Sequence, residues 1–271
     1  MNDRLKRILA VLGVILLLAV FALPMFFAGG TGENSQNMFL GAVALAVFIP
    51  ILIYVVMQAF KVFGRKDKNT GRVHNVVFDI GNVLMKFGWE SYLDSYGFDS
   101  EKREKIADAV FRNDLWNERD RGVLTEEECV QKFVELLPEY EEDIREVVSR
   151  SGESVTLNPY SVSWLRYLKE KGYGTFILSN YSEYGLEKGR EDMKFLKYAD
   201  GAVFSCEEKV IKPEPEIYRI LLNRYGLKPE DCVFIDDRED NVEAARSLGM
   251  KGIVFKDFKS AVSNLESLGI K

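Results

Sequence analysis

Polar and charged side chains follow four short apolar runs of the sequence. Asp79 follows HNVVF, Ser179 follows GTFIL, Lys212 comes shortly after GAVFS, and Asp236–Asp237 follow CVFI. If these side chains meet, the three carboxylates would repel one another, and a divalent cation would relieve that repulsion. Oxygen ligands alone favour Mg²⁺. A lysine and a hydroxyl beside such a metal can bind a phosphoryl group while a carboxylate attacks it.

A parallel sheet would bring these side chains together. The runs are short, apolar and rich in β-branched residues, as buried strands are. Amphipathic stretches alternate with them, which predicts βαβ units and an α/β fold with a Rossmann-like parallel sheet. Ligands bind outside the carboxyl ends of such strands. The expected strands are 74–79, 174–178, 201–205, 232–235 and 252–255, and the expected helices are 160–171, 214–225 and 241–248.

A charged stretch of helical period separates the first expected strand from the second. We interpret residues 88–157 as an inserted helical cap over the carboxyl edge of the sheet. Within it, Trp116–Gly122 (WNERDRG) is interpreted as a loop, either one that reaches the substrate or an ordinary connection between helices.

The four motifs resemble those of the haloacid dehalogenase-like hydrolase superfamily. They are Phe78–Leu84 (FDIGNVL), Leu178–Asn180 (LSN), Lys212–Pro213 and Phe234–Asp237 (FIDD), the last followed by Asp240-Asn241. The resemblance covers residues 73 to about 260 and implies a hydrolase domain over residues 73–271 with a small helical cap. The Gly-Asn-Val-Leu form of the first motif is similar to that of bacterial phosphatases acting on small phosphorylated metabolites, sugar phosphates among them.

The resemblance implies a role for each matching position. Asp79 would be the nucleophile, and Lys212 would neutralise charge on Asp79 and on the phosphoryl group. Ser179 and the Asn180 amide would hold the phosphate. The Mg²⁺ ligands would be Asp79, the main-chain carbonyl of Gly81, and Asp236 and Asp237 directly or through water.

Position 81 departs from the pattern of this superfamily. Most of its phosphatases carry a second aspartate two residues after the nucleophile, as the general acid for the leaving group, but this chain has Gly81. General acid–base help contributes about 10²–10⁴-fold to a rate. Three consequences stay open: the acid comes from the cap or from water, the leaving group is a good one, or the domain turns over poorly.

The predicted function is a membrane-anchored, Mg²⁺-dependent phosphatase that works through an aspartyl-phosphate. One alternative is a catalytically weak binding or scaffold module tethered to a membrane partner, which Gly81 favours. The other is a haloacid dehalogenase, which the acidic pair Asp236–Asp237 disfavours because dehalogenation needs no metal. Nothing in the sequence identifies a protein partner.

The first 60 residues contain two long uncharged apolar stretches. Each is long enough to cross a bilayer as a helix, so we predict transmembrane helices at about 8–29 and 38–60, followed by a basic linker at 61–72. Lys and Arg flank the pair and are missing from the loop between, which predicts a multi-pass protein of the cell membrane with both termini and the hydrolase domain in the cytoplasm. A cleaved signal peptide and a buried soluble hairpin are the alternatives.

Charge and composition exclude several classes of function. Residues 1–72 carry eight basic and three acidic residues, so residues 73–271 hold a net charge of −11 out of a total of −6. An acidic domain of this kind is a poor nucleic-acid binder. The one histidine, His74, argues against chemistries that need several His ligands and against a Ser–His–Asp triad. The cysteines, which form neither a disulfide framework nor a zinc pattern, are Cys129, Cys206 and Cys232.

Overall fold

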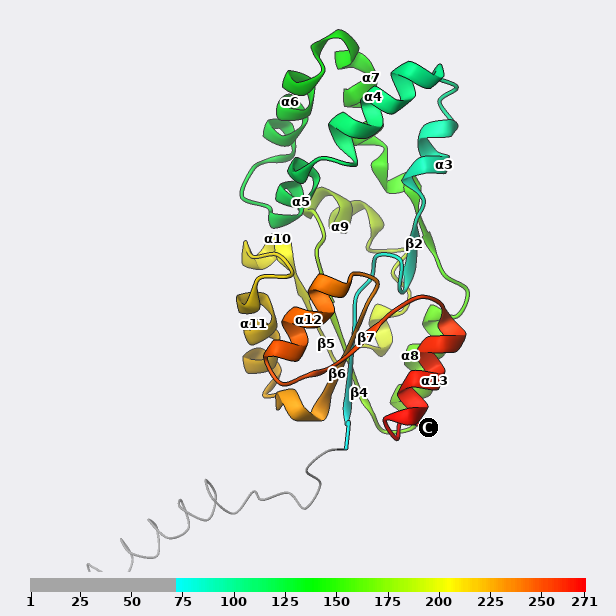
Figure 1. The fold of residues 1–271 in the computed structure, drawn as a ribbon, viewed down its shortest axis with the longest axis vertical. Coiled ribbons are helices and arrows are strands. Elements are labelled where there is room, and N and C mark those ends of the chain that lie inside the picture. The colour runs from blue at the N-terminus through cyan, green and yellow to red at the C-terminus, as the bar shows by residue number, and fades with distance from the viewer. Residues whose placement is uncertain (1–71) are drawn as a thin grey trace, which may run out of the picture. The chain divides into compact units, whose positions relative to one another are not determined.

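A five-stranded parallel sheet lies at the centre of the computed structural model, which describes residues 72–271 (Figure 1). Its strands are β1 (Asn75–Phe78), β4 (Gly174–Ser179), β5 (Gly201–Phe204), β6 (Cys232–Asp236) and β7 (Lys251–Val254). They lie in the order β5–β4–β1–β6–β7, and every neighbouring pair is parallel. The predicted α/β class with a parallel sheet is therefore confirmed.

The register of the three central strands sets their carboxyl ends level. Phe78 of β1 pairs with Ile177 of β4 and with Ile235 of β6. The next residue of β1, Asp79, donates its main-chain N–H to the carbonyl of Ile235 over 2.9 Å. Asp79 and Asp236 therefore emerge side by side at one edge of the sheet.

Amphipathic helices cover both faces of the sheet (Figure 1). One pair packs on the face that buries Phe234, and the other on the face that buries Phe78. The ring of Phe78 meets that of Trp164 edge-on, with centroids 4.8 Å apart. The first pair is α11 (Pro215–Tyr225) and α12 (Glu239–Ser247), and the second is α8 (Ser161–Glu170) and α13 (Phe258–Ser267).

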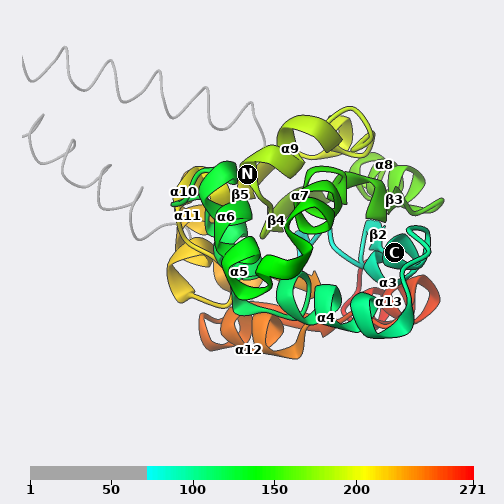
Figure 2. The same cartoon turned by 90° about the horizontal axis from the view of Figure 1, so that it is seen from above.

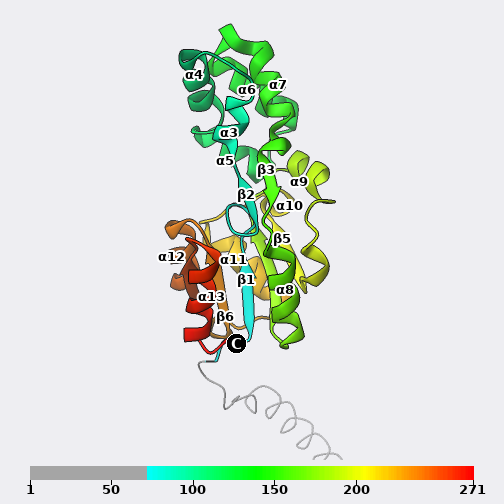
Figure 3. The same cartoon turned by 90° about the vertical axis from the view of Figure 1, so that its right-hand side faces the viewer.

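A two-stranded antiparallel ribbon carries the chain out of the sheet and back (Figure 3). It consists of β2 (Met85–Phe87) and β3 (Val155–Leu157), with Phe87 opposite Val155. We call the residues between its strands, 88–154, the cap. The cap helices are α3 (Trp89–Asp94), α4 (Ser100–Val110), α5 (Asp114–Arg121), α6 (Glu126–Leu136) and α7 (Glu141–Ser149), with 3₁₀ turns at Pro138–Tyr140 and Ser151–Ser154.

The cap has a hydrophobic core of its own, made by residues of α3, α4, α6 and α7, and Figure 2 shows these helices from above. Leu93, Ile106, Phe133 and Ile144 are fully buried in it. Thr125 begins α6 with a capping box, since its side chain accepts from the Glu128 N–H while the Glu128 carboxylate accepts from Thr125. The cap is thus a packed unit that can hold a side chain in a fixed place.

The segment interpreted as a cap loop is mostly helix, because α5 runs through it as far as Arg121. Asn113 starts the helix by accepting a hydrogen bond from the N–H of Leu115. Gly122 ends it in the left-handed conformation, with φ of 69°. The loop interpretation of residues 116–122 was therefore wrong, because both ends carry ordinary helix caps.

Shorter elements also link the sheet strands, and those that follow a strand lie at the same edge as Asp79. After β4 comes helix α9 (Glu183–Gly189), and after β5 comes the single turn α10 (Ser205–Glu208). The 3₁₀ turns at Leu196–Tyr198 and Pro229–Asp231 precede β5 and β6.

The predicted localisation to the cell membrane is corrected here. Among residues 72–271 no helix is both long and apolar enough to cross a bilayer. The longest helices of this range have 11 residues, about half the length that a bilayer requires. The predicted hairpin (8–29 and 38–60), and all but the last residue of the predicted linker, lie outside the described residues.

Candidate active site

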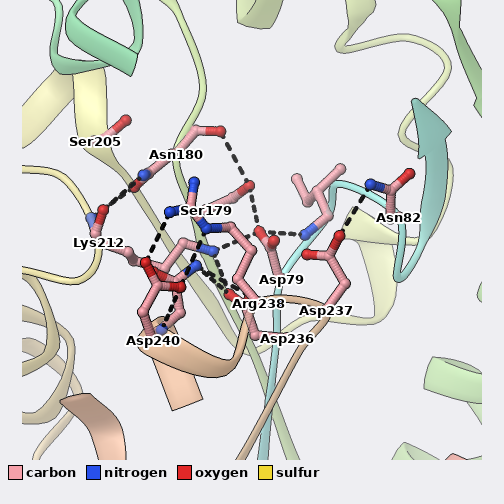
Figure 4. A network of polar contacts seen from close by, with 12 residues as sticks. Asp79, Asn82, Ser179, Asn180, Ser205, Lys212, Asp236, Asp237, Arg238 and Asp240 are labelled. Atoms are coloured by element: carbon pink, nitrogen blue, oxygen red, sulfur yellow. Dashed lines mark hydrogen bonds and ion pairs between the residues drawn. The ribbon is translucent and has the colours of Figure 1, made fainter. Parts of the chain in front are cut away.

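Asp79 has one carboxylate oxygen held by three donors (Figure 4). Its Oδ1 accepts hydrogen bonds from Ser179 Oγ over 2.8 Å and from the main-chain N–H of Ile80 over 2.7 Å. Lys212 Nζ lies 2.7 Å from the same oxygen. These contacts fix the carboxylate and orient its second oxygen, Oδ2, toward Gly81, where an added Cβ would lie 3.9 Å away.

Lys212 is buried between two carboxylates. Its Nζ lies 2.7 Å from Asp79 Oδ1 and 2.7 Å from Asp236 Oδ2, and the residue is 3% exposed. Burial alone would lower the pKa of Lys212, but Asp236 and Asp79 outweigh it and raise that pKa. Burial also raises the pKa of Asp79 to about 7, against the lowering effect of Lys212. One ammonium thus faces two carboxylates, so the local charge is negative.

Asn180 positions Lys212 through its side chain. The side-chain Nδ2 donates to the main-chain carbonyl of Lys212 over 3.0 Å, and Oδ1 accepts from the Lys212 N–H over 2.8 Å. Both atoms of the side-chain amide are therefore engaged. Asn180 can still offer a phosphate its main-chain N–H and the second N–H of Nδ2.

Asp236 is surrounded by donors from the protein. It is fully buried, and besides Lys212 it accepts from the main-chain N–H of Arg238 over 2.8 Å. Asn241 Nδ2 donates to both of its oxygens, over 3.0 and 3.1 Å. The structure therefore favours Asp236 as a residue that orients Lys212 and contacts a cation only indirectly.

Asp237 is more open than its neighbour. Its Oδ2 accepts from Asn82 Nδ2 over 2.9 Å. Burial raises the pKa of Asp237, and the bond from Asn82 opposes that rise. Asn82 also accepts from the N–H of Phe87 over 3.1 Å, so it connects Asp237 to the start of the cap.

The acidic group fits a divalent cation that prefers oxygen ligands. One oxygen from each of Asp79, Asp236 and Asp237 lies within 4.8 Å of the others. Asn241 Oδ1, buried next to Asp236, has no hydrogen-bond partner among residues 72–271. A water of the kind that Mg²⁺ retains would supply the missing donor. The donor set and the excess negative charge both agree with Mg²⁺.

A cavity of about 320 Å³ opens above these residues. The sheet edge contributes Asp79, Gly81, Asn180, Lys212 and Asp237 to its lining. A wall of aromatic rings faces them, formed by Phe87 at the end of β2 and by Phe111 and Trp116 of the cap. Phe87 and Trp116 are stacked, with centroids 5.9 Å apart and ring planes 20° from parallel. The cavity thus joins a charged floor to a partly apolar wall.

The structure brings together every residue of the predicted site: Asp79, Gly81, Ser179, Asn180, Lys212, Asp236 and Asp237. Sequence reasoning left out Asn82, which orients Asp237. It included Arg119 and Asp120 only within the segment that either reaches the substrate or connects helices, and both line the cavity from α5. The WNERDRG segment was the signal that could have indicated those two.

The fold and the site are those of an α/β protein with a buried carboxylate directly after the first strand of a parallel sheet. The chain belongs to the haloacid dehalogenase-like hydrolase family, because the family model of that description matches residues 73–249.

Several known proteins are similar to this chain. Flavin mononucleotide hydrolase 1 of Arabidopsis thaliana chloroplasts is 28% identical over 158 residues, which are 58% of this chain and 62% of the relative. A phosphorylated carbohydrates phosphatase of Thermotoga maritima is 28% identical over 187 residues, 66% of this chain and 82% of the relative.

Among solved structures, a HAD family enzyme of Bacteroides thetaiotaomicron in complex with magnesium and inorganic phosphate has the same fold. Its TM-score is 0.54 at 22% identity, and the match covers 70% of this chain and 98% of that one. Mg²⁺, the predicted cofactor, is typical of the family. The chain spans 62%, 34%, 23% and 19% of the lengths of the first four curated relatives that it matches.

Proposed function

We propose that this chain is a Mg²⁺-dependent phosphatase that transfers the phosphoryl group of a small phosphomonoester to Asp79 and then to water. The observation that supports it most directly is the Asp79 carboxylate, held by Lys212, Ser179 and a main-chain N–H at the floor of the cavity. Asp237 beside it favours a phosphatase over a dehalogenase, because dehalogenation needs no metal ligand there.

In the first step, an oxygen of Asp79 attacks phosphorus while the bond between phosphorus and the leaving oxygen breaks. Ser179 keeps the carboxylate oriented, and Lys212 offsets negative charge on Asp79 and on the phosphoryl oxygens. Mg²⁺, held by Asp79, Asp237 and the Gly81 carbonyl with Asp236 behind them, would supply charge stabilisation of the phosphoryl group.

In the second step, water attacks the phosphorus of the aspartyl-phosphate. The bond from phosphorus to the Asp79 oxygen breaks, inorganic phosphate leaves, and Asp79 returns to a carboxylate. Lys212 and Ser179 hold the same oxygen in both steps, so the site needs no rearrangement between them.

The cavity supports a leaving group that is partly apolar. Phe87, Phe111 and Trp116 form one wall, whereas Arg119 and Asp120 supply polar contacts beside it. Aromatic side chains bind the flat apolar faces of sugars and ring systems alike. A sugar phosphate and a phosphorylated aromatic compound both match this lining. The two relatives described above are named for substrates of these two kinds, a phosphorylated carbohydrate and flavin mononucleotide.

The experiment is phosphate release by the full chain over a panel of phosphomonoesters with and without Mg²⁺. We expect Mg²⁺-dependent release that is lost in Asp79→Asn. Asp257→Asn is the matched control, because Asp257 is an exposed helix N-cap and asparagine caps equally well. Release that persists in Asp79→Asn would contradict the proposal.

Two further measurements separate the alternatives. Beryllofluoride mimics the aspartyl-phosphate, so tight Mg²⁺-dependent binding of it would show a competent nucleophile and argue against a scaffold. Halide release from a haloacid without metal would favour the dehalogenase.

A further inference from the structure

A carboxyl group of the cap lines the same cavity as the proposed nucleophile. Asp120 lies at the C-terminal end of α5 and is partly buried. It lines the cavity together with Asp79, Gly81 and Lys212. It is close enough to Asp79 and Lys212 for their charges to act on it. The phosphoryl-transfer steps above leave this group without a role.

We propose that Asp120 is the general acid that protonates the leaving oxygen, in place of the carboxylate that position 81 lacks. The inference rests on the proposed phosphatase function and adds a catalytic residue to it. The cap is the part of the chain that faces the leaving group, because the sheet edge below it holds the phosphoryl-binding residues.

Contacts with the sheet domain hold this end of α5 in place. Ser205 Oγ donates to the main-chain carbonyl of Asp120 over 2.5 Å and accepts from the N–H of Tyr181 over 2.9 Å. Ser205 is fully buried, so this bridge is shielded from water. It ties Asp120 to the loop after β4, which contains Asn180 and Tyr181.

Two further contacts hold the residues that follow Asp120. Arg121 forms an ion pair with Glu214 at 2.7 Å, and Lys209 Nζ donates to the carbonyl of Gly122. Gly122 approaches Cys206 so closely that an added Cβ would lie 2.9 Å from Cys206 Cα. Asp120 is therefore fixed relative to the sheet edge and does not depend on a mobile loop for its position.

The surroundings of Asp120 raise its pKa toward neutral pH. Burial raises the pKa of Asp120 to about 7, and Arg119 and a hydrogen bond from the Ser182 backbone oppose that rise. A general acid works best with a pKa near the working pH. The titratable and charged groups that face it from the packed elements are Arg119, Asp79, Lys212, Tyr181 and Cys206.

Asp120 donates a proton in the first step and regains one in the second. As Asp79 attacks and the bond from phosphorus to the leaving oxygen breaks, the Asp120 proton moves to that oxygen, and the product leaves as an alcohol. The Asp120 carboxylate then accepts a proton from the water that attacks the aspartyl-phosphate. Phosphate departs, and Asp120 is protonated again for the next substrate.

The test compares two aryl phosphates in the full chain and in Asp120→Asn. 4-Nitrophenyl phosphate has a good leaving group and needs little acid help, whereas phenyl phosphate has a poor one. We expect Asp120→Asn to lose about 10²-fold or more in kcat on phenyl phosphate and less than about threefold on 4-nitrophenyl phosphate. The basic limb of the pH profile for phenyl phosphate, which reports loss of the acid proton, should disappear.

A rescue variant completes the test. Position 81 has room for a side chain, since its Cβ would meet Asp79 Oδ2 at an ordinary 3.9 Å. Gly81→Asp in the Asp120→Asn background should restore phenyl phosphate hydrolysis, and Gly81→Asn should not. Retained beryllofluoride binding by Asp120→Asn would show that it is folded.

Three results would overturn the inference. Equal losses on both esters would show that Asp120 only positions the cap, and no loss on either would show that it takes no part. In both cases the phosphatase proposal stands if the unmodified chain is active. Inactivity of the unmodified chain on both esters would overturn the phosphatase proposal and this inference with it.

Discussion

The side-chain amide of Asn180 forms two hydrogen bonds with the main chain of Lys212, one through Nδ2 and one through Oδ1. This pair connects the loop after β4 to the loop that carries the lysine. The ammonium of Lys212 reaches Asp79 from a backbone that Asn180 holds. Asn180 is therefore a positioning residue for the lysine, whatever its own N–H contributes to phosphate binding.

Asn180→Asp should lower kcat while leaving KM nearly unchanged. The new carboxylate oxygen would face the carbonyl of Lys212 and could not donate to it, which costs about 2 kcal/mol, or roughly 30-fold in rate. Steady-state phosphate release measures both constants. Asn223→Asp, an exposed change on α11, is the control and should leave both unaltered. A rise in KM alone would contradict the positioning role.

Lys212→Met should destabilise the metal-free chain by about 3–5 kcal/mol at pH 8, because two buried carboxylates lose their cation. The pKa of Asp79 is already raised to about 7, and loss of the lysine raises it further. A carboxyl with a raised pKa in the folded state loses stability as pH rises through that value. The penalty should therefore shrink at pH 5, as urea unfolding would show. An equal penalty at both pH values would contradict this account.

Trp116→Ala should raise KM for an aromatic phosphomonoester about tenfold with kcat nearly constant. The substitution removes a ring of the cavity wall without touching the phosphoryl-binding residues. Tyr167→Ala, which truncates an exposed ring on α8, is the control. If kcat falls and KM stays constant, the wall acts on the transition state and not on binding.

Gly122→Ala should lower hydrolysis of phenyl phosphate by disturbing the contact between α5 and α10. Its Cβ would press on Cys206, and its φ of +69° is unfavourable for alanine. Gly97→Ala is a matched control, because Gly97 has φ of +67° but nothing within 4 Å. Gly97→Ala should lose about 1 kcal/mol of unfolding free energy, and Gly122→Ala should lose more. A similar loss of kcat in both variants would show that the loss does not come from the contact between α5 and α10.

The sheet and its chemistry could be predicted because each strand is a short apolar run that ends in a polar side chain. Asp79 and Asp236 become neighbours as soon as β1 and β6 pair in parallel, which the alternation of strands and helices indicates. The strands β2 and β3 were not predicted, since three residues such as MKF and VTL show no periodicity. Helices α9 and α13 were missed as well.

The part of the site that depends on packing between distant segments could not be predicted. Asp120 lies near Asp79 only because Ser205 and Gly122 join α5 to the sheet domain. No local pattern encodes that contact. The pair of hydrogen bonds between Asn180 and Lys212 is a similar case, because 32 positions separate the two residues.

The pairing of Phe87 with Val155 makes the cap exchangeable as a module. The chain leaves and re-enters the sheet domain through adjacent strands, so the two ends of the insertion stay together whatever lies between them. Evolution, or a protein engineer, can replace or lengthen the helices without moving β1, which leads into Asp79, or the loop that carries Lys212. Cap side chains can therefore change, singly or with whole helices, while the site at the sheet edge stays as it is.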